Sequence, residues 1–420
     1  MKTISKYVTI VLLALAALPL AAQNQRDLQN FRYPDQRGID QFEANKDTVS
    51  TYDGVHVRVG GASTIQFQDL SHENDLNNLA DLEGNFNLAT ANLDLDVALY
   101  DGVRMHLRTY LSSQHHNEAY VKGGYIQIDK LDFISEGFAE GLMDHLRIKI
   151  GHMENNYGDA HFRRTDNAMA LYNPFVGNYL MDSFTTEVGA EVYYFGGPWF
   201  AMVGFTNSKL NQSTLDVDTD PSFLAKVGYD NQATEGLRFR LTGSVFSSPQ
   251  RQMGAHGGTQ YLYAGDRAGT RYYNVMEGSF RAGRVNPEFG TELTSFMINP
   301  FLKYGGLEFF GIFESASGSD NVDWNQYSGE LVYRFGTDDD LYIGARYNTA
   351  DGKLVTPTEG TPLINDVSVN RFQLGAGWFM TKNILAKVEY VNQNYNDYPA
   401  GSIYSGGNFK GFTLEAAISF

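Results

Sequence analysis

The sequence predicts an all-β fold: a sixteen-stranded antiparallel β-barrel that crosses a membrane. Three observations predict it. Apolar and polar residues alternate along most of the chain. Very short turns alternate with long polar loops, and the chain ends on Phe420. Side chains of a strand point alternately to its two faces. The alternation therefore gives each strand an apolar face for lipid and a polar face for a lumen.

The composition agrees with many short strands and excludes several classes of site. Of the 420 residues, 14% are aromatic and 43 are Gly, which is too aromatic for a disordered chain. There is no Cys, so disulfides, thiolate metal sites and Cys nucleophiles are excluded. The net charge of −17 argues against binding to nucleic acid. We expect no metal and no cofactor.

The N-terminus predicts export from the cytoplasm. Lys2 and Lys6 precede an apolar run over 8–20, and small residues follow it. A run of ~13 residues has the length of a signal sequence and is too short to span a membrane as a helix. We expect residues 1–22 to be a signal peptide and 54–420 to be the barrel. Residues 23–53 show no alternation and are expected to be a periplasmic N-terminal extension or, alternatively, a peptide placed in the lumen.

The segment after Gly102 has the alternation that predicts a strand. Val103, Met105 and Leu107 would face lipid, whereas Arg104 and His106 would face the lumen. A strand needs ~9–11 residues to cross, and similar segments recur to the end of the chain. The sixteen predicted strands are 54–68, 84–99, 103–114, 118–129, 144–153, 183–195, 199–208, 221–230, 236–247, 293–304, 307–315, 325–336, 341–349, 368–380, 384–393 and 409–420.

The connections fix the predicted orientation. Tight turns at 100–102, 195–198, 305–306 and 381–383 belong on the periplasmic side, and the long polar loops belong outside. An even number of strands returns both termini to the periplasm. The segment 248–292 could hold one more hairpin, which would make eighteen strands; its Gly and charge density favour a single loop instead.

Two further patterns indicate an outer-membrane protein. Aromatic residues such as Trp199, Tyr304 and Trp378 lie near strand ends, where interfacial girdles form. The last nine residues, 412–420, alternate and end on Phe420. They are similar to the C-terminal strand by which outer-membrane proteins are recognised for barrel insertion. We therefore expect the outer membrane of a Gram-negative bacterium as the location, with its lipid and the barrel-assembly machinery as partners.

The polar face of the predicted strands leans basic although the whole chain is acidic. Rings of Arg and Lys favour anions in a pore, so we expect a water-filled channel for passive diffusion that favours small anionic solutes. The long connection 154–182 follows the fifth strand and is expected to fold inward as a constriction. Alternatively, the charges pair across neighbouring strands and only keep the lumen wet. The candidate pore-lining residues are Arg104, Arg108, Arg147, Lys149, Arg163, Arg164, Arg238 and Arg240.

Three stretches carry a resemblance to a known family: "EAYVKGGYIQID" (118–129), "LRIKIGHMENNYGDAHFRRTDNA" (146–168) and "DSFTTEVGAEVYY" (182–194). With them the chain resembles the phosphate-selective porin O and P family, in the form found in Bacteroidetes. The resemblance implies a homotrimer of sixteen-stranded channels that pass anions such as phosphate. No lysine cluster of the family can be aligned with this chain. The counterparts of the family's arginine ladder, by location only, are Arg104, Arg108, Arg147, Lys149, Arg163 and Arg164.

Other functions remain as alternatives. The barrel could be a structural or adhesive protein whose lumen is plugged by residues 23–53 or 154–182. It could also be a specific uptake channel for sugars or other small solutes. An enzyme is not expected, because the His residues show neither a metal-binding spacing nor a partner Ser on a lipid-facing surface.

Overall fold

The structure is a computed structural model. It describes residues 28–44, 46–47, 49–112, 116–165, 169–208, 220–248, 261–264, 272–278, 282–287, 289, 292–319, 322–356 and 363–420. The predicted signal peptide, residues 1–22, lies outside the described residues, as does most of the connection over 249–292.

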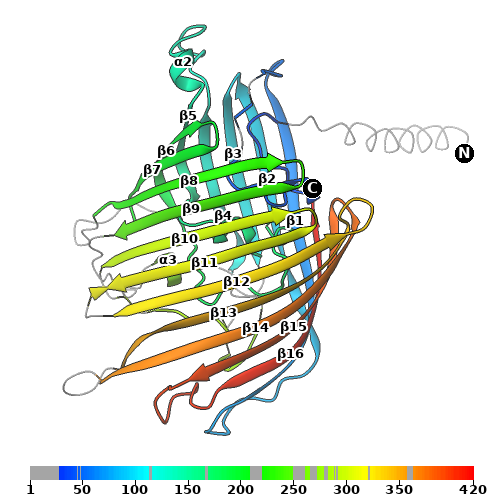
Figure 1. The fold of residues 1–420 in the computed structure, drawn as a ribbon, viewed down its shortest axis with the longest axis vertical. Coiled ribbons are helices and arrows are strands. Elements are labelled where there is room, and N and C mark those ends of the chain that lie inside the picture. The colour runs from blue at the N-terminus through cyan, green and yellow to red at the C-terminus, as the bar shows by residue number, and fades with distance from the viewer. Residues whose placement is uncertain are drawn as a thin grey trace, which may run out of the picture.

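The described residues form sixteen strands in a closed antiparallel barrel (Figure 1). Each strand pairs with its neighbours in sequence, and β1 pairs with β16 to close the wall. The strands are β1 (His56–Glu73), β2 (Asn85–Tyr100), β3 (Val103–Ser112), β4 (His116–Ile128), β5 (Leu146–Glu154), β6 (Thr186–Gly196), β7 (Trp199–Thr206), β8 (Ser222–Thr234), β9 (Leu237–Ser248), β10 (Leu293–Tyr304), β11 (Leu307–Gly318), β12 (Asp323–Phe335), β13 (Leu341–Thr356), β14 (Leu363–Thr381), β15 (Ile384–Asn396) and β16 (Asn408–Ser419).

The predicted fold class and strand number are confirmed. The decisive detail is the pairing of β9 with β10, which runs from Ser248 opposite Leu293 to Leu237 opposite Tyr304. Because these two strands are direct neighbours, no hairpin from the long connection enters the wall. The eighteen-stranded alternative is therefore wrong.

The ends of several strands differ from the prediction. β1 continues to Glu73, and β13 and β14 remain paired out to Thr356 opposite Leu363. The prediction ended these strands where the apolar alternation stops. Backbone pairing needs no apolar residue, so the ladder extends beyond the apolar band into polar sequence.

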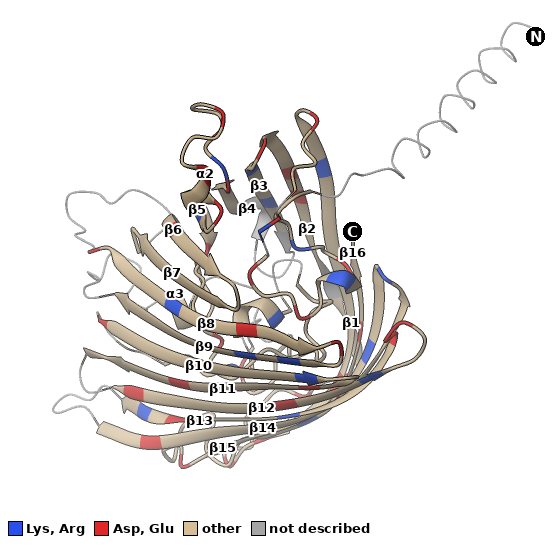
Figure 2. Cartoon of the chain, turned by 45° about the horizontal axis from the view of Figure 1, so that its top comes forward, with Lys and Arg blue, Asp and Glu red and all other residues tan. Residues whose placement is uncertain are grey.

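The wall has the two faces that the alternation predicts. On β12, Leu331 and Tyr333 are about half exposed on the outside, whereas Glu330, Val332 and Arg334 are buried on the inside. Charged residues on the strands accordingly lie on the inner face or near strand ends (Figure 2). A continuous apolar outer surface of this kind is stable against lipid rather than water.

Exposed aromatic side chains form two belts on the outer face. One belt lies at the end of the barrel where the short turns are, and the second lies toward the long loops. The first belt contains Tyr100, Tyr194, Trp199, Tyr304, Tyr333, Phe335 and Trp378. The second contains Phe86, Phe205, Phe223, Phe296, Phe313, Tyr327, Tyr347, Phe372 and Phe412. Two aromatic belts that flank an apolar band are typical of a barrel at the two interfaces of a bilayer.

In the residues that the structure describes, helical structure is limited to short pieces in the connections. These are η1 (Gln36–Gly38), α2 (Glu140–Met143), η2 (Ala160–Arg163) and α3 (Tyr261–Ala264). In the described part of the chain, none of the helices is long and apolar enough to cross a membrane. The C-terminus closes the barrel against β1, where the backbone N and O of Phe420 bond to Gly61 at 2.9 and 3.0 Å.

Candidate functional site

The connection between β5 and β6, residues 155–185, folds into the lumen. Its side chains Phe175, Val176 and Leu180 are fully buried. Backbone N–H groups buried away from water need acceptors, and polar side chains of the inner wall supply them. Leu180 N donates to Asn348 Oδ1 at 2.7 Å, and Val176 N donates to Glu389 Oε2 at 2.8 Å.

Carbonyl groups of the same loop also find partners on the wall. Lys387 Nζ donates to the carbonyl oxygens of Ala170 and Phe175 at 3.0 and 3.1 Å. The polar inner face of the barrel therefore holds the backbone of this inward loop.

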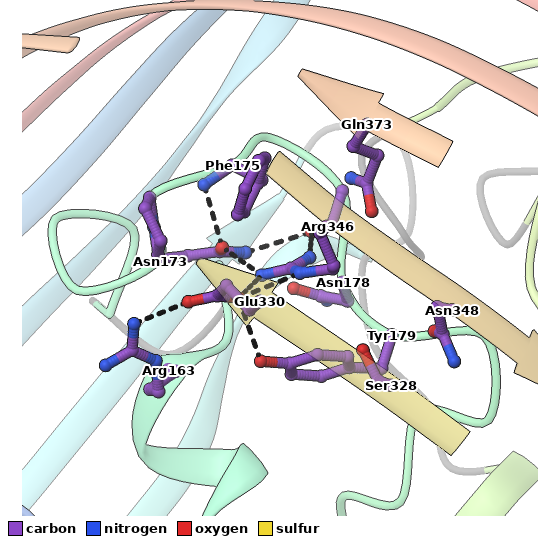
Figure 3. Close-up of polar contacts among 12 residues, drawn as sticks. Arg163, Asn173, Phe175, Asn178, Tyr179, Ser328, Glu330, Arg346, Asn348 and Gln373 are labelled. Atoms are coloured by element: carbon purple, nitrogen blue, oxygen red, sulfur yellow. Dashed lines mark hydrogen bonds and ion pairs between the residues drawn. The ribbon is translucent and has the colours of Figure 1, made fainter. Parts of the chain in front are cut away.

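Glu330 on β12 is the centre of one ionic cluster between the loop and the wall (Figure 3). Its carboxylate lies 2.5 Å from Arg163 Nη2 of the loop and 2.7 Å from Arg346 Nη2 of β13. Tyr179 Oη donates to the same carboxylate at 3.1 Å. Arg346 also donates to Asn173 Oδ1 at 2.9 Å, so the cluster joins two parts of the loop to one patch of wall.

A second cluster lies against β8 and β9. Lys226 Nζ lies 2.6 Å from Asp159 Oδ1 and 2.8 Å from Glu43 Oε1. Arg240 contacts the same two carboxylates, at 2.9 Å for Asp159 and 2.6 Å for Glu43. Burial alone would raise the pKa of Glu43, but Arg240 and Lys226 outweigh it and hold this pKa well below its usual value.

Most of residues 28–44 lie inside the barrel, whereas Gln36 reaches the short turns at its end, where its backbone N donates to the carbonyl oxygen of Lys382 at 2.8 Å. Asp40 pairs with Arg163 of the inward loop at 2.9 Å and with Lys303 of β10 at 3.1 Å. Burial opposes ionisation of Asp40, yet Lys303 and Arg163 lower its pKa overall. Arg238 Nη1 donates to the carbonyl oxygen of Asp40 at 2.8 Å. The sequence leaves two placements open for this N-terminal segment, a periplasmic extension and a peptide in the lumen. These contacts are of the kind that a peptide in the lumen makes.

A packed apolar core occupies the side of the lumen formed mainly by β7 to β16. Leu180 of the inward loop and Val275 of the connection after β9 belong to it, together with Phe310 and Val369 of the wall. All four side chains are at most 1% exposed. The inner face of β7 to β16 is therefore covered mainly by protein rather than by water.

A cavity of about 170 Å³ lies on the other side, against β1 to β6. Its lining comes from the wall, from the inward loop and from residues 31–44. Seven Lys and Arg side chains line it against four Asp and Glu side chains, so the charge around the cavity is positive. Four of the predicted pore-lining residues contribute to it: Arg104, Arg108, Arg147 and Lys149.

The structure places all eight predicted pore-lining residues inside the barrel, but it pairs seven of them with carboxylates. The nearest pairs are Arg104–Asp96 at 3.2 Å, Arg108–Asp94 at 2.8 Å, Arg147–Asp129 at 2.8 Å, Arg163–Glu330 at 2.5 Å, Arg164–Asp182 at 2.6 Å, Arg238–Asp230 at 2.7 Å and Arg240–Glu43 at 2.6 Å. Lys149 is the exception: its Nζ lies 5.4 and 5.2 Å from the ring centroids of Tyr125 and Tyr193.

Sequence reasoning identified Arg163 and Arg164 of the inward loop but missed the other residues of the site that lie outside strands. Arg32, Asp40 and Glu43 belong to a segment with no alternation, and Asp159 pairs with the wall rather than with the neighbouring arginines of its own loop. The one available signal was the charge of residues 32–43, which includes acidic residues that can pair with a basic inner face. Among the described residues, no group of three or more His, Asp or Glu side chains could hold a metal ion.

Comparisons with known proteins identify the fold. No family model and no curated protein sequence matches the chain. The anion-selective porin of Comamonas acidovorans superposes with a TM-score of 0.55 at 11% identity, over 87% of this chain and 100% of that one. OprB of Pseudomonas putida gives 0.53 at 11% identity, over 87% of this chain and 94% of that one. OmpF of Salmonella typhi gives 0.51 at 12% identity, over 89% of this chain and 100% of that one.

Identities of 11–12% are too low to carry a function or a particular porin family from these structures to this chain. The resemblance to the phosphate-selective porin O and P family therefore stays a prediction. The chain has the barrel fold of bacterial outer-membrane porins.

Proposed function

We propose that the protein is an outer-membrane channel through which small solutes diffuse passively, with a preference for anions. One observation carries the proposal: a closed wall that is apolar outside surrounds a charged cavity in which Lys and Arg outnumber Asp and Glu. A barrel of sixteen strands is wide enough to hold an aqueous channel. The apolar outer face and its two aromatic belts support a place in the outer membrane, reached by means of the signal peptide predicted for residues 1–22.

The proposed anion preference rests on the surplus of positive charge around the cavity. It does not rest on a ladder of free arginines, because seven of the eight predicted residues have carboxylate partners. A paired arginine contributes little net field to the pore. We therefore expect a moderate preference for anions over cations, with phosphate as one of the anions that pass.

Planar-bilayer recording tests this proposal. The purified protein should form channels in KCl, and the reversal potential in a salt gradient should have the sign of anion selectivity. A reversal potential of the opposite sign would contradict the anion preference. Absence of conductance at every voltage would contradict the channel itself.

One specific observation favours a second candidate, a barrel whose lumen is closed. The inward loop, residues 28–44 and the core around Leu180 together occupy much of the interior. A closed barrel would act through its external loops as a structural or adhesive protein. The same bilayer experiment separates the two, since a closed barrel inserts without passing current.

Two partner proposals accompany the channel. We infer that three copies assemble, as the sequence resemblance implies and as is described for one form of OmpT of Vibrio cholerae, which shares the fold with a TM-score of 0.50. The mass of the protein–detergent complex by light scattering tests this. We also infer that the barrel-assembly machinery recognises the C-terminal strand through Phe420, whose side chain is half exposed; Phe420→Ala should lower the amount of assembled barrel in the outer membrane.

A further inference from the structure

Lys149 on β5 lines the cavity without a carboxylate partner among the described residues. Glu191 of β6 lies opposite it in the strand register. That carboxylate is already used: it accepts hydrogen bonds from Tyr193 Oη at 2.5 Å and from the backbone N of Asn156 at 3.0 Å. The ammonium group of Lys149 instead lies near the faces of the Tyr125 and Tyr193 rings.

Arg32 of the N-terminal segment lines the same cavity and is also without an ion pair in the described part of the chain. Its guanidinium donates to the carbonyl oxygens of Gly38 at 3.0 Å and Phe162 at 3.2 Å, and it stacks 3.8 Å from the ring centroid of Tyr172. Burial lowers the pKa of Arg32, which reflects the cost of holding this charge without a counterion.

The other charges of the cavity do not balance these two cations. Asp96 alone serves three basic groups, namely Arg104 at 3.2 Å, His106 at 2.8 Å and Arg58 at 3.9 Å. Asp94 pairs with Arg108, and Glu154 lies 3.5 Å from Nη1 of the same arginine. Glu43 pairs with Lys226 and Arg240. A solute anion would therefore supply negative charge that the protein itself does not provide.

Aromatic rings separate the basic groups of the cavity lining. They come from three different parts of the chain: Phe31, Tyr125, Phe162, Tyr172 and Tyr193. Ring faces accept both cations and flat apolar groups. The cavity thus offers charge and a flat apolar surface side by side, in a volume of about 170 Å³.

We propose that this cavity binds a small carboxylate that carries an aromatic ring. Arg32 and Lys149 would face the carboxylate of the solute, and the tyrosine and phenylalanine rings of the cavity would face its aromatic ring. This rests on the proposed function and names its substrate class. A purely inorganic anion would satisfy the two cations but would gain nothing from the rings. A sugar would cover the rings but would leave both cations without a counterion. An aromatic carboxylate satisfies both.

Calorimetric titration of the folded protein in detergent tests the proposal with three small probes. Benzoate carries charge and ring, acetate carries only the charge, and benzyl alcohol carries only the ring. We expect benzoate to bind at least about tenfold more tightly than either of the others, because each lost contact of this type is worth about one factor of ten. Equal affinity for acetate would overturn the role of the rings. Equal affinity for benzyl alcohol would overturn the role of the cations.

Variants test the two named residues. Lys149→Gln and Arg32→Gln should each weaken benzoate binding about tenfold, whereas Lys149→Arg should retain it. Lys353→Gln is the matched control, since Lys353 belongs to an exposed ion pair with Asp323 on β13 and β12. Unchanged affinity in both Gln variants would overturn the assignment. If a variant fails to fold, the titration of the three probes on the unaltered protein still tests the proposal.

Recording in bilayers separates this inference from the channel proposal. If KCl is conducted and benzoate neither binds nor blocks, the channel stands and the aromatic carboxylate site is wrong. If benzoate binds in detergent but no current flows, the site stands and passive diffusion is wrong.

Discussion

Glu330 accepts hydrogen bonds from two arginines that reach it from different parts of the chain. Arg163 comes from the inward loop and Arg346 from the neighbouring strand β13. All three side chains are at most 2% exposed. Replacing one member of such a buried group leaves a charge without a partner, which costs more than the pair itself contributes.

Glu330→Gln should lower the free energy of unfolding by about 3–5 kcal/mol, because it leaves Arg346 buried without its carboxylate. The measurement is urea unfolding of the barrel in detergent, followed by fluorescence. Glu235→Gln is the control, since Glu235 is exposed in the turn after β8. Equal stability of Glu330→Gln and the unaltered protein would contradict a structural role for the cluster.

The eight basic residues show what could be predicted at this scale. Six of them lie on strands, and strand periodicity placed all six on the inner face. Periodicity could not identify their partners, since Arg240 and Glu43 are 197 positions apart and Arg163 and Glu330 are 167 apart. Which carboxylate reaches which arginine depends on how the loop and the N-terminal segment lie inside the barrel.

The N-terminal segment, residues 28–44, is held in the lumen mainly by charge. Asp40 and Glu43 bind four basic groups of the wall and the loop: Arg163, Lys226, Arg240 and Lys303. The segment has no regular backbone pairing with the wall, so it contributed no alternation from which its position could be predicted.

The double substitution Asp40→Asn and Glu43→Gln should release this segment and raise the single-channel conductance, because the segment loses its ion pairs with four cations of the wall and the loop, and the lumen widens. Recording in KCl before and after substitution measures this. Glu136→Gln, in the exposed connection before β5, should leave the conductance unchanged. A double variant with the conductance of the unaltered protein would show that the segment does not limit the passage.

Acid should release the same segment only well below the usual carboxylate range. The pKa values of Asp40, Glu43 and Asp159 are lowered by the neighbouring basic groups, which outweigh the effect of burial. The unfolded state therefore binds more protons below about pH 4, and the stabilisation is complete above that pH and is lost as the pH falls through the lowered values. The hydrogen-exchange protection factors of residues 28–44, which are corrected for the intrinsic effect of pH on exchange, should be unchanged from about pH 7 to pH 5. Loss of protection already near pH 5 would contradict the lowered values.

The wall of the whole molecule follows from the sequence because lipid outside and water or protein inside impose a period of two on every strand. The same rule explains the strand count, since β9 and β10 keep their alternation on either side of a long connection. The rule does not predict where β13 and β14 end, because their pairing continues past the apolar band. The period of two does not predict the packed core around Leu180, because that core is formed by contacts between the inner wall and connections that have no alternation.

Val203→Arg, on the outer face of β7, should destabilise the folded barrel in liposomes by about 2–4 kcal/mol, the cost of a charge near the middle of a bilayer. Val57→Arg, at the second residue of β1, should cost about 0–1 kcal/mol because it lies near the interface. Urea unfolding in liposomes measures both. A similar cost at the two positions would contradict the placement of the membrane around this wall.

Because a packed core covers the inside of β7 to β16, the circumference of the barrel does not determine the largest solute that it can pass. Only the arc formed by β1 to β6 borders the open cavity. Uptake of neutral solutes of graded mass should therefore stop at smaller molecules than the circumference of the wall would admit. Changes in the inward loop could then alter that limit while every strand and its pairing stay the same.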